Sequence, residues 1–209
     1  DIFNVSLGDR KFAFTDNLHL AEVDLQKRAR DYLNREINIL SSSYRYLQTL
    51  NLDSCFSVLK YSPGIEEYAL LTSIEEILTN DVEFDTIIFD TPPTGLTLRF
   101  LALPSITITW LDRLIYLRQE ILRKRYTIRK VTGAQTKESV LHYEEKDDAL
   151  LNKLRAMTAD YQSLKRILQG ESCSFVVIFN PDVLSLKESE RLVNGLRDLN
   201  LPLRLFVNN

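Results

Sequence analysis

The stretch from Phe84 to Phe100 constrains the fold of this chain more than any other part of it. It contains Thr86–Phe89, a run of β-branched and aromatic residues without alternation, which is typical of a strand buried on both faces of a parallel sheet. The run ends at Asp90, and two prolines and a glycine follow. Apolar residues at helical spacing then continue to Pro104. The pattern predicts a strand, a tight loop and a helix that ends at the proline.

Asp90 stands at the carboxyl end of the predicted strand, where open α/β sheets bind their ligands. Gly95 leaves the backbone N–H open to an anion, and a helix N-terminus attracts phosphate. Carboxylates and phosphates together are ligands of Mg²⁺. The arrangement therefore suits phosphate and Mg²⁺. The spacing alone is equally compatible with a structural alternative, in which Asp90 caps the loop or the helix.

Residues 90–104 read D-T-P-P-T-G-L-T-L-R-F-L-A-L-P. This stretch closely resembles the D-T-A-P-T-G-H-T-L-R-x-L-x-L-P signature of the arsenical pump-driving ATPase (ArsA) family, which includes the targeting ATPases for tail-anchored membrane proteins. The resemblance implies that the stretch is the second switch of an ATPase. Asp90 would then hold Mg²⁺ through its water shell, and Thr94 and Gly95 would sense the γ-phosphate of ATP. Leu96 replaces the usual His, so a role of that His in partner coupling is not expected here.

Three further motifs agree with the same family. Residues 63–67, P-G-I-E-E, match a family motif, and apolar spacing from Ile65 predicts a helix that ends near residues 79–80. The two Glu residues also suit the dipole of that helix. Pro181 and Asp182 follow a second predicted strand, 175–179, where relatives have P-E; the resemblance places this acid near the nucleotide and the dimer interface. Asn208 ends the last predicted strand, 203–207, and the resemblance implies that its amide reads the adenine base.

The sequence thus predicts an α/β fold, a three-layer P-loop NTPase type with a mostly parallel sheet and an inserted helical subdomain. We expect residues 1–104 and 170–209 to form the nucleotide-binding core, and residues 105–169 to form the helical subdomain. The helical region contains apolar stripes. In the targeting branch of the family this region forms a groove for membrane helices, but an apolar stripe is more often the core face of a helix than a binding site.

A phosphate-binding P-loop is missing from these residues, which contain no G-x-x-x-x-G-K-[S/T] sequence. The resemblance places that loop before residue 1. Because phosphoryl transfer depends on positioning and charge stabilisation, we expect residues 1–209 alone not to hydrolyse ATP. Two other functions stay open: a non-enzymatic interaction module, or a nucleotide-sensing pseudo-ATPase with the same fold.

The resemblance further implies ATP and Mg²⁺ as cofactors, a homodimer in the intact protein, and a partner that is an ion, a hydrophobic client helix or a membrane protein. Composition adds little, since the net charge is −3 and 44% of the residues are hydrophobic. A basic run between Arg118 and Lys130 could face nucleic acid or anionic lipid. Because Leu and Ile are interleaved, it favours a solvated helix face, and we expect no nucleic-acid partner. We find no apolar run near the length of a membrane span and no signal-peptide layout, and expect a cytoplasmic protein.

Overall fold

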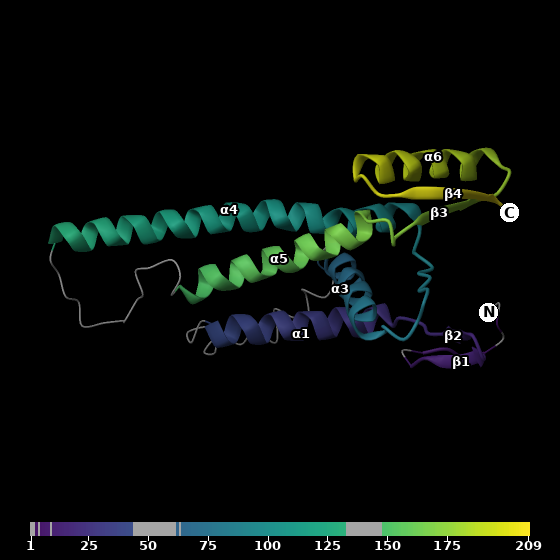
Figure 1. The fold of residues 1–209 in the computed structure, drawn as a ribbon, viewed down its shortest axis with the longest axis horizontal. Helices are drawn as coiled ribbons and strands as arrows, with labels where there is room; N and C mark the ends of the chain where they lie inside the picture. The colour runs from purple at the N-terminus through teal and green to yellow at the C-terminus, as the bar shows by residue number, and fades with distance from the viewer. Residues whose placement is uncertain (1–2, 4, 9, 44–61, 63, 133–147) are drawn as a thin grey trace. The chain divides into compact units, whose positions relative to one another are not determined.

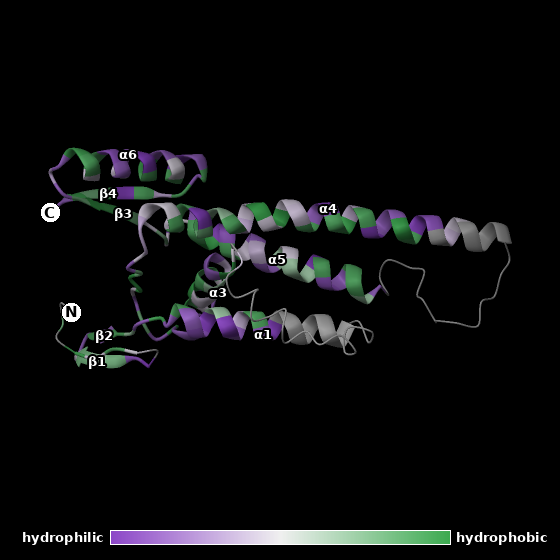
Figure 2. Ribbon diagram, turned by 180° about the vertical axis from the view of Figure 1, so that it is seen from behind, coloured by the Kyte–Doolittle hydropathy of each residue, from purple (hydrophilic) through white to green (hydrophobic). Residues whose placement is uncertain are grey.

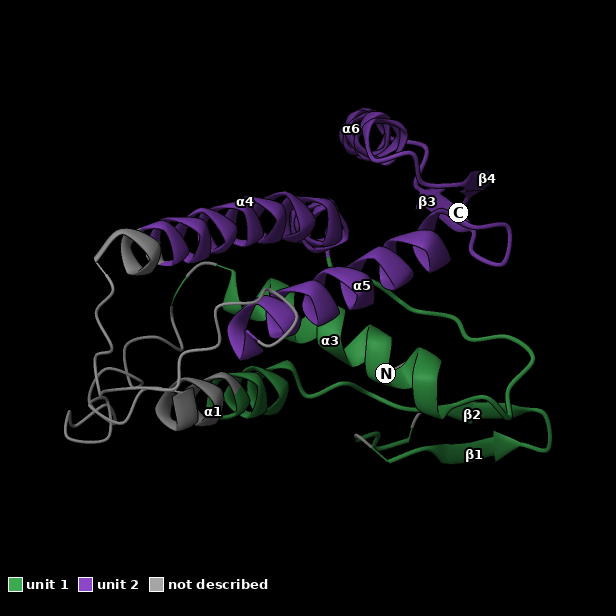
Figure 3. Cartoon of the chain, turned by 60° about the vertical axis from the view of Figure 1, so that its left-hand side comes forward, with its two compact units in different colours: residues 1–92 green, residues 93–209 purple. Residues whose placement is uncertain are grey.

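The computed structural model describes residues 3, 5–8, 10–43, 62, 64–132 and 148–209 (Figure 1). The chain divides into two compact units, residues 1–92 and 93–209, which are drawn in different colours in Figure 3. Each unit is described separately below.

The first unit begins with a hairpin. Strands β1 (Phe12–Thr15) and β2 (Leu18–Leu20) pair antiparallel across a two-residue turn, with Phe12 opposite Leu20. A hairpin is favoured here because Asp16 and Asn17 are both turn-forming residues.

Two helices complete the first unit, α1 (Leu25–Ser43) and α3 (Ile65–Asn80). Asp24 caps α1, because its Oδ1 accepts a hydrogen bond from the Lys27 N–H at 2.9 Å. The helix predicted after Pro63 and Gly64 is confirmed with its predicted bounds, and Gly64 takes a left-handed φ of 96° just before it. Buried Ala29 and Leu33 of α1 and Ala69 and Leu71 of α3 form the small core of this unit.

Helices α4 (Thr94–Thr132) and α5 (Ala149–Gln169) pack together and form the larger part of the second unit (Figures 1 and 3). Their apolar contact surfaces are buried, including Phe100, Leu111 and Leu122 of α4 and Leu151 and Leu164 of α5. The segment 133–147, which links the two helices in sequence, lies outside the described residues.

A polar contact is enclosed in the same interface. The Arg118 guanidinium donates to both carboxylate oxygens of Asp148, from Nε to Oδ1 at 3.1 Å and from Nη2 to Oδ2 at 2.8 Å. Asp148 also caps α5, since its Oδ1 accepts from the Leu151 N–H at 2.7 Å. The carboxylate is buried and has three hydrogen-bond donors, so its charge is compensated inside the unit.

The rest of the second unit is a β-α-β segment. Strands β3 (Phe175–Phe179) and β4 (Leu203–Asn208) pair in parallel and are joined by α6 (Val183–Asp198). Helix α6 covers one face, where Val177, Val193 and Leu196 are buried. Both predicted strands and the helix between them are confirmed, and Figure 2 shows how apolar the two strands are.

Two local predictions are wrong. Residues 86–89 do not form the predicted strand, and Ile88 is 86% exposed. A buried strand needs paired neighbours, and among the described residues β1 pairs only with β2 and β3 only with β4. The sheet predicted as one parallel layer therefore appears as two small sheets, of which one is parallel.

The second wrong prediction concerns Pro104, which lies inside α4 and does not end it. Proline removes the N–H that would bond to the Phe100 carbonyl group. Phe100 and Pro104 are both almost fully buried, and this apolar packing offsets the missing hydrogen bond. The predicted boundary between the nucleotide-binding core and the helical subdomain, at residue 105, falls within α4, which is continuous there. That boundary remains a prediction.

Because α4 continues through Pro104, the chain contains a longer apolar helix than the sequence analysis predicts. Residues Thr94–Lys124 are long and apolar enough to cross a membrane, judged by length and composition, whereas no such run was expected. Core helices of soluble proteins meet the same criterion, and part of this helix forms the core described above.

The packing of α4 against α5 can be tested with two neighbouring leucines. Leu151 is 0% exposed and Leu150 is 42% exposed, so the same truncation is made once in the core and once at the surface. We expect Leu151→Ala to lower the free energy of unfolding by about 2–5 kcal/mol and Leu150→Ala to change it by about 0.5 kcal/mol or less. Urea unfolding followed by circular dichroism measures both. Equal losses would contradict the described core.

Candidate functional site

The first part of the predicted site is the segment from Asp90 to Pro93, which has no regular secondary structure. The Asp90 side chain is exposed at the end of the first unit. Upstream, a turn at 81–84 is held by the hairpin: Lys11 Nζ lies 2.7 Å from Asp81 Oδ1 and 2.7 Å from Glu83 Oε1. His19 contacts the Phe84 ring edge-on at 5.2 Å between ring centroids, which gives this histidine a packing role.

These contacts shift the ionisation of the charged groups at the turn. Hydrogen bonds to Asp81 and Glu83 raise the pKa of the Lys11 ammonium group. The hydrogen bond from Lys11 lowers the pKa of the Glu83 carboxyl group. A carboxyl group with a lowered pKa stabilises the fold above its ordinary pKa, and this contribution is lost as the pH falls through the lowered value. Both side chains are well exposed, so the effect is small.

The second part is the N-terminus of α4, which begins in the second unit with Thr94 and Gly95. The Pro93 carbonyl oxygen accepts from the Leu96 N–H at 3.0 Å and from the Thr97 N–H at 3.2 Å. The two earlier N–H groups, those of Thr94 and Gly95, have no acceptor within the helix itself, as at any helix start. A Cβ atom added at Gly95 would meet nothing within 4 Å, so its backbone faces open space.

The third part lies at the carboxyl ends of β3 and β4, where Asn208 is paired in register with Phe179. The ladder continues one residue further, because the Asn209 N–H donates to the Phe179 carbonyl oxygen at 2.9 Å. The side chains of Asn209 and Asn180 meet here, with Nδ2 of the first 3.4 Å from Oδ1 of the second. Exposed amide groups therefore gather at this edge of the sheet.

Asp182 has a structural role that the sequence analysis missed. Its Oδ1 accepts from the Ser185 N–H at 2.8 Å and so caps α6. The Ser185 hydroxyl oxygen accepts in turn from the Asn180 N–H at 2.9 Å. The signal was present in the sequence, since Asp followed three residues later by Ser is a common helix start.

The structure thus places the predicted residues in two groups. Asp182 and Asn208 lie at the same edge of the β3–β4 sheet, because both follow the carboxyl ends of parallel strands in one unit. Thr94 and Gly95 belong to that unit, through α4, and Asp90 belongs to the other.

The donor set fits Mg²⁺ held through water better than a closed metal site. Within the described residues, no three His, Cys, Asp or Glu side chains lie close enough to share a metal ion. Mg²⁺ commonly keeps several waters and takes one or two carboxylates together with substrate phosphates. An exposed single carboxylate such as Asp90 suits that mode. Cys173 is half-buried, and burial raises the pKa of its thiol, so it is a poor metal ligand.

Comparison with known proteins defines the class. The family model described as anion-transporting ATPase matches residues 1–209, and the chain belongs to this family. The resemblance based on residues 90–104 is therefore confirmed. The family has the P-loop NTPase α/β fold, and this chain is an α/β protein with few strands.

Individual relatives come from both branches of the family. The chain is 26% identical over its whole length to the putative arsenical pump-driving ATPase 2 of Aquifex aeolicus, and covers 65% of that protein. It is 33% identical to the ATPase GET3B of Arabidopsis thaliana over 70% of the chain and 34% of the relative. It is 31% identical to the ATPase GET3 of Komagataella phaffii over 70% of the chain and 41% of the relative. The chain spans less than two thirds of each of these relatives.

Two variants of Asp182 separate the contribution of its helix cap from that of its charge. We expect Asp182→Ala to lower the free energy of unfolding by about 0.5–2 kcal/mol because the α6 cap is lost. Asp182→Asn keeps an acceptor oxygen and should leave stability nearly unchanged. Thermal unfolding of both variants measures this. Equal destabilisation by Ala and Asn would show that the charge, and not the cap, stabilises the helix.

Proposed function

We propose that this chain is part of a cytoplasmic ATPase that binds ATP with Mg²⁺ and couples hydrolysis to an ion or membrane-protein partner. The observation that carries the proposal is the switch signature at residues 90–104, in a chain that matches the ATPase family over its full length. The name of one relative, arsenical pump-driving ATPase, supports an ion partner. The membrane-protein partner rests on the family resemblance of residues 90–104. The proposed intact protein is a homodimer.

In this proposal Asp90 holds Mg²⁺ through bound water, and the first turn of α4 receives the γ-phosphate. An exposed carboxylate followed by the N-terminus of a 39-residue helix supports these roles. The open space at Gly95 supports close approach of an anion to the backbone. Bound Mg²⁺ would neutralise charge that develops on the transferred phosphoryl group.

Asn208 is proposed to contact adenine, because an amide both donates to and accepts from a base edge. Its position at the carboxyl end of a parallel strand supports the assignment. Asp182 is a weaker candidate for the nucleotide site, since its carboxylate already accepts a backbone hydrogen bond. The whole proposal requires a phosphate cradle that residues 1–209 do not contain.

Asp90 can be tested against a nearby carboxylate of similar exposure. In the full-length protein that contains these residues, we expect Asp90→Asn to lower kcat for ATP hydrolysis roughly 100-fold, because one preorganised charge at the phosphoryl group is lost. Asp85→Asn makes the same change five residues earlier and should leave kcat unchanged. Steady-state ATP hydrolysis in Mg²⁺ measures both. If Asp90→Asn kept the parent rate, the proposed catalytic role would be wrong.

Gly95→Ala separates binding from folding. The added methyl group meets no atom of the chain, and alanine favours a helix by up to about 1 kcal/mol, so we expect stability to stay equal or rise. If a phosphate approaches this backbone, the methyl group should weaken ATP–Mg²⁺ binding about tenfold, or about 1.4 kcal/mol. Gly8→Ala, also in open space, is the matched control. Calorimetric titration measures the affinities, and unchanged affinity in Gly95→Ala would remove Gly95 from the phosphate site.

A further inference from the structure

Helix α4 carries a line of exposed apolar side chains that the packing of the second unit does not use. Five residues form this α4 stripe: Ile106, Trp110, Leu114, Leu117 and Ile121. Their spacing of three or four residues places them along one side of the helix. At 1.5 Å per residue the stripe is about 22 Å long. Their side chains are 44–66% exposed, and Trp110 is the most exposed of them.

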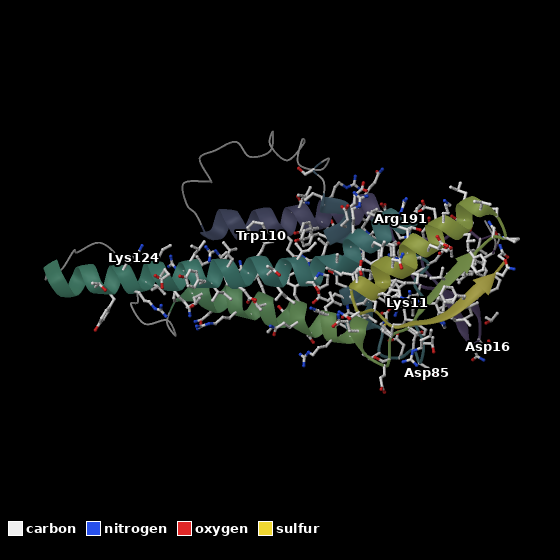
Figure 4. All side chains as sticks on the ribbon, turned by 90° about the horizontal axis from the view of Figure 1, so that it is seen from above. Lys11, Asp16, Asp85, Trp110, Lys124 and Arg191 are labelled. Carbon is white, nitrogen blue, oxygen red and sulfur yellow. The ribbon has the colours of Figure 1, made fainter. Side chains whose placement is uncertain are left out.

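The stripe is distinct from the core face of α4. Leu111 and Leu122 are buried, and Arg118 between them is bound to Asp148 at the start of α5. By the helical period the stripe lies roughly a quarter turn from these residues. Figure 4 shows Trp110 and Lys124 along the same helix. Exposed apolar residues that are contiguous over such a length mark a contact surface more often than scattered ones do.

Charge near the stripe has one dominant sign. Arg113 and Lys124 lie on the helix beside it by the same period, and both are exposed. Towards the helix end, the sequence from 118 to 132 contains six basic residues (Arg118, Arg123, Lys124, Arg125, Arg129 and Lys130) and one acidic residue, Glu120. The apolar stripe therefore continues into a strongly basic segment, which complements a negatively charged surface.

We propose that α4 docks on an anionic lipid surface, with the α4 stripe in the membrane interface and the basic side chains beside it, Arg113 and Lys124, over the lipid headgroups. An aromatic residue supports this placement, since Trp110 lies within the stripe and is 66% exposed. Trp and Tyr favour the boundary between water and lipid, because they are apolar with a polar edge. Lipid docking through α4 needs no nucleotide chemistry.

Spanning the membrane is a less favourable use of the same helix, although its length and composition permit it. Asp112, Arg113, Arg118 and Glu120 would lie in the hydrocarbon, at about 2.5–3.5 kcal/mol for each Asp or Arg near the centre. The core contacts of α4 with α5 would also be lost. At the interface these charges stay in water, and the core remains intact.

An apolar protein helix is the main other occupant, and the basic segment distinguishes the two. A neutral apolar helix gains nothing from Arg113 and Lys124 beside the stripe, whereas each Lys or Arg near an anionic bilayer strengthens binding. Attraction of this kind is screened by salt over about 8 Å at physiological ionic strength. Dependence on anionic lipid and on salt is therefore the expected signature.

Trp110 is the only tryptophan of the 209 residues and reports directly on the stripe. The chain is mixed with phosphatidylcholine vesicles, with or without phosphatidylserine, and examined by tryptophan emission and by flotation. We expect a blue shift of the emission and co-flotation with the phosphatidylserine vesicles, and a loss of both in high salt. No blue shift with either vesicle would overturn the proposal, and so would equal binding to both, because the charge would then play no part.

Two pairs of variants locate the surface. Leu117→Glu in the α4 stripe should lower vesicle binding about tenfold or more, whereas Leu186→Glu on α6, where the leucine is similarly exposed, should leave it unchanged. Lys124→Glu should weaken binding to phosphatidylserine vesicles several-fold, and Lys187→Glu on α6 should not. Equal effects of each pair would overturn the assignment to α4.

A further arm distinguishes lipid from protein. The chain is titrated with a soluble, uncharged apolar helical peptide, and its self-association is followed by sedimentation. A blue shift with the peptide, or on dimer formation, without one on anionic vesicles would assign the stripe to a protein partner and overturn the lipid proposal.

Discussion

Burial of the core face of α4 is the interaction on which most of the described structure depends. The helix contributes Phe100, Leu111 and Leu122 to the interface with α5, and its first turns meet α6. A Cβ atom added at Gly195 of α6 would lie 2.6 Å from both terminal carbons of Leu98, so the two helices approach closely there. The same α4 begins at the loop that carries the switch signature. Packing of α4 therefore fixes where the N-terminus of this helix is presented.

The success of the sequence analysis followed the strength of local signals. The helix after Gly64 was predicted with its bounds, because a Pro-Gly turn, acidic residues in the first turn and apolar periodicity all agree. Strands β3 and β4 were predicted from short runs rich in apolar residues. The family signature at 90–104 was recognised from fifteen consecutive residues, and the family match confirmed it.

The failures arose where a structure depends on distant partners. Thr86–Phe89 has the composition of a buried strand, yet composition cannot supply the neighbouring strands that such a strand needs. The sequence predicts a helix end at Pro104 because proline lacks a backbone N–H. The burial of Pro104 that offsets the lost hydrogen bond cannot be seen in the sequence. The ion pair between Arg118 and Asp148 joins residues 30 positions apart, and no local sequence pattern predicts it.

Hydrogen bonds within the chain hold the polar edge of the β3–β4 sheet, where two of the predicted site residues lie. The family resemblance predicts Asp182 near the nucleotide, and in the structure this residue caps α6, with Ser185 completing the local network. Asn208 stands beside this network at the end of a strand whose ladder extends to Asn209. A ligand arriving there would meet a backbone already fixed by hydrogen bonds, so little conformational entropy would be lost on binding.

The bond between Arg118 and Asp148 has a consequence for how the two long helices can move. Apolar side chains alone tolerate sliding, since leucine contacts are much alike from one turn to the next. A slide by one helical turn, about 5.4 Å, would separate a buried carboxylate from its guanidinium and leave both charges uncompensated. The ion pair thus fixes the register of α4 against α5. Any displacement of one of these helices has to move the other with it.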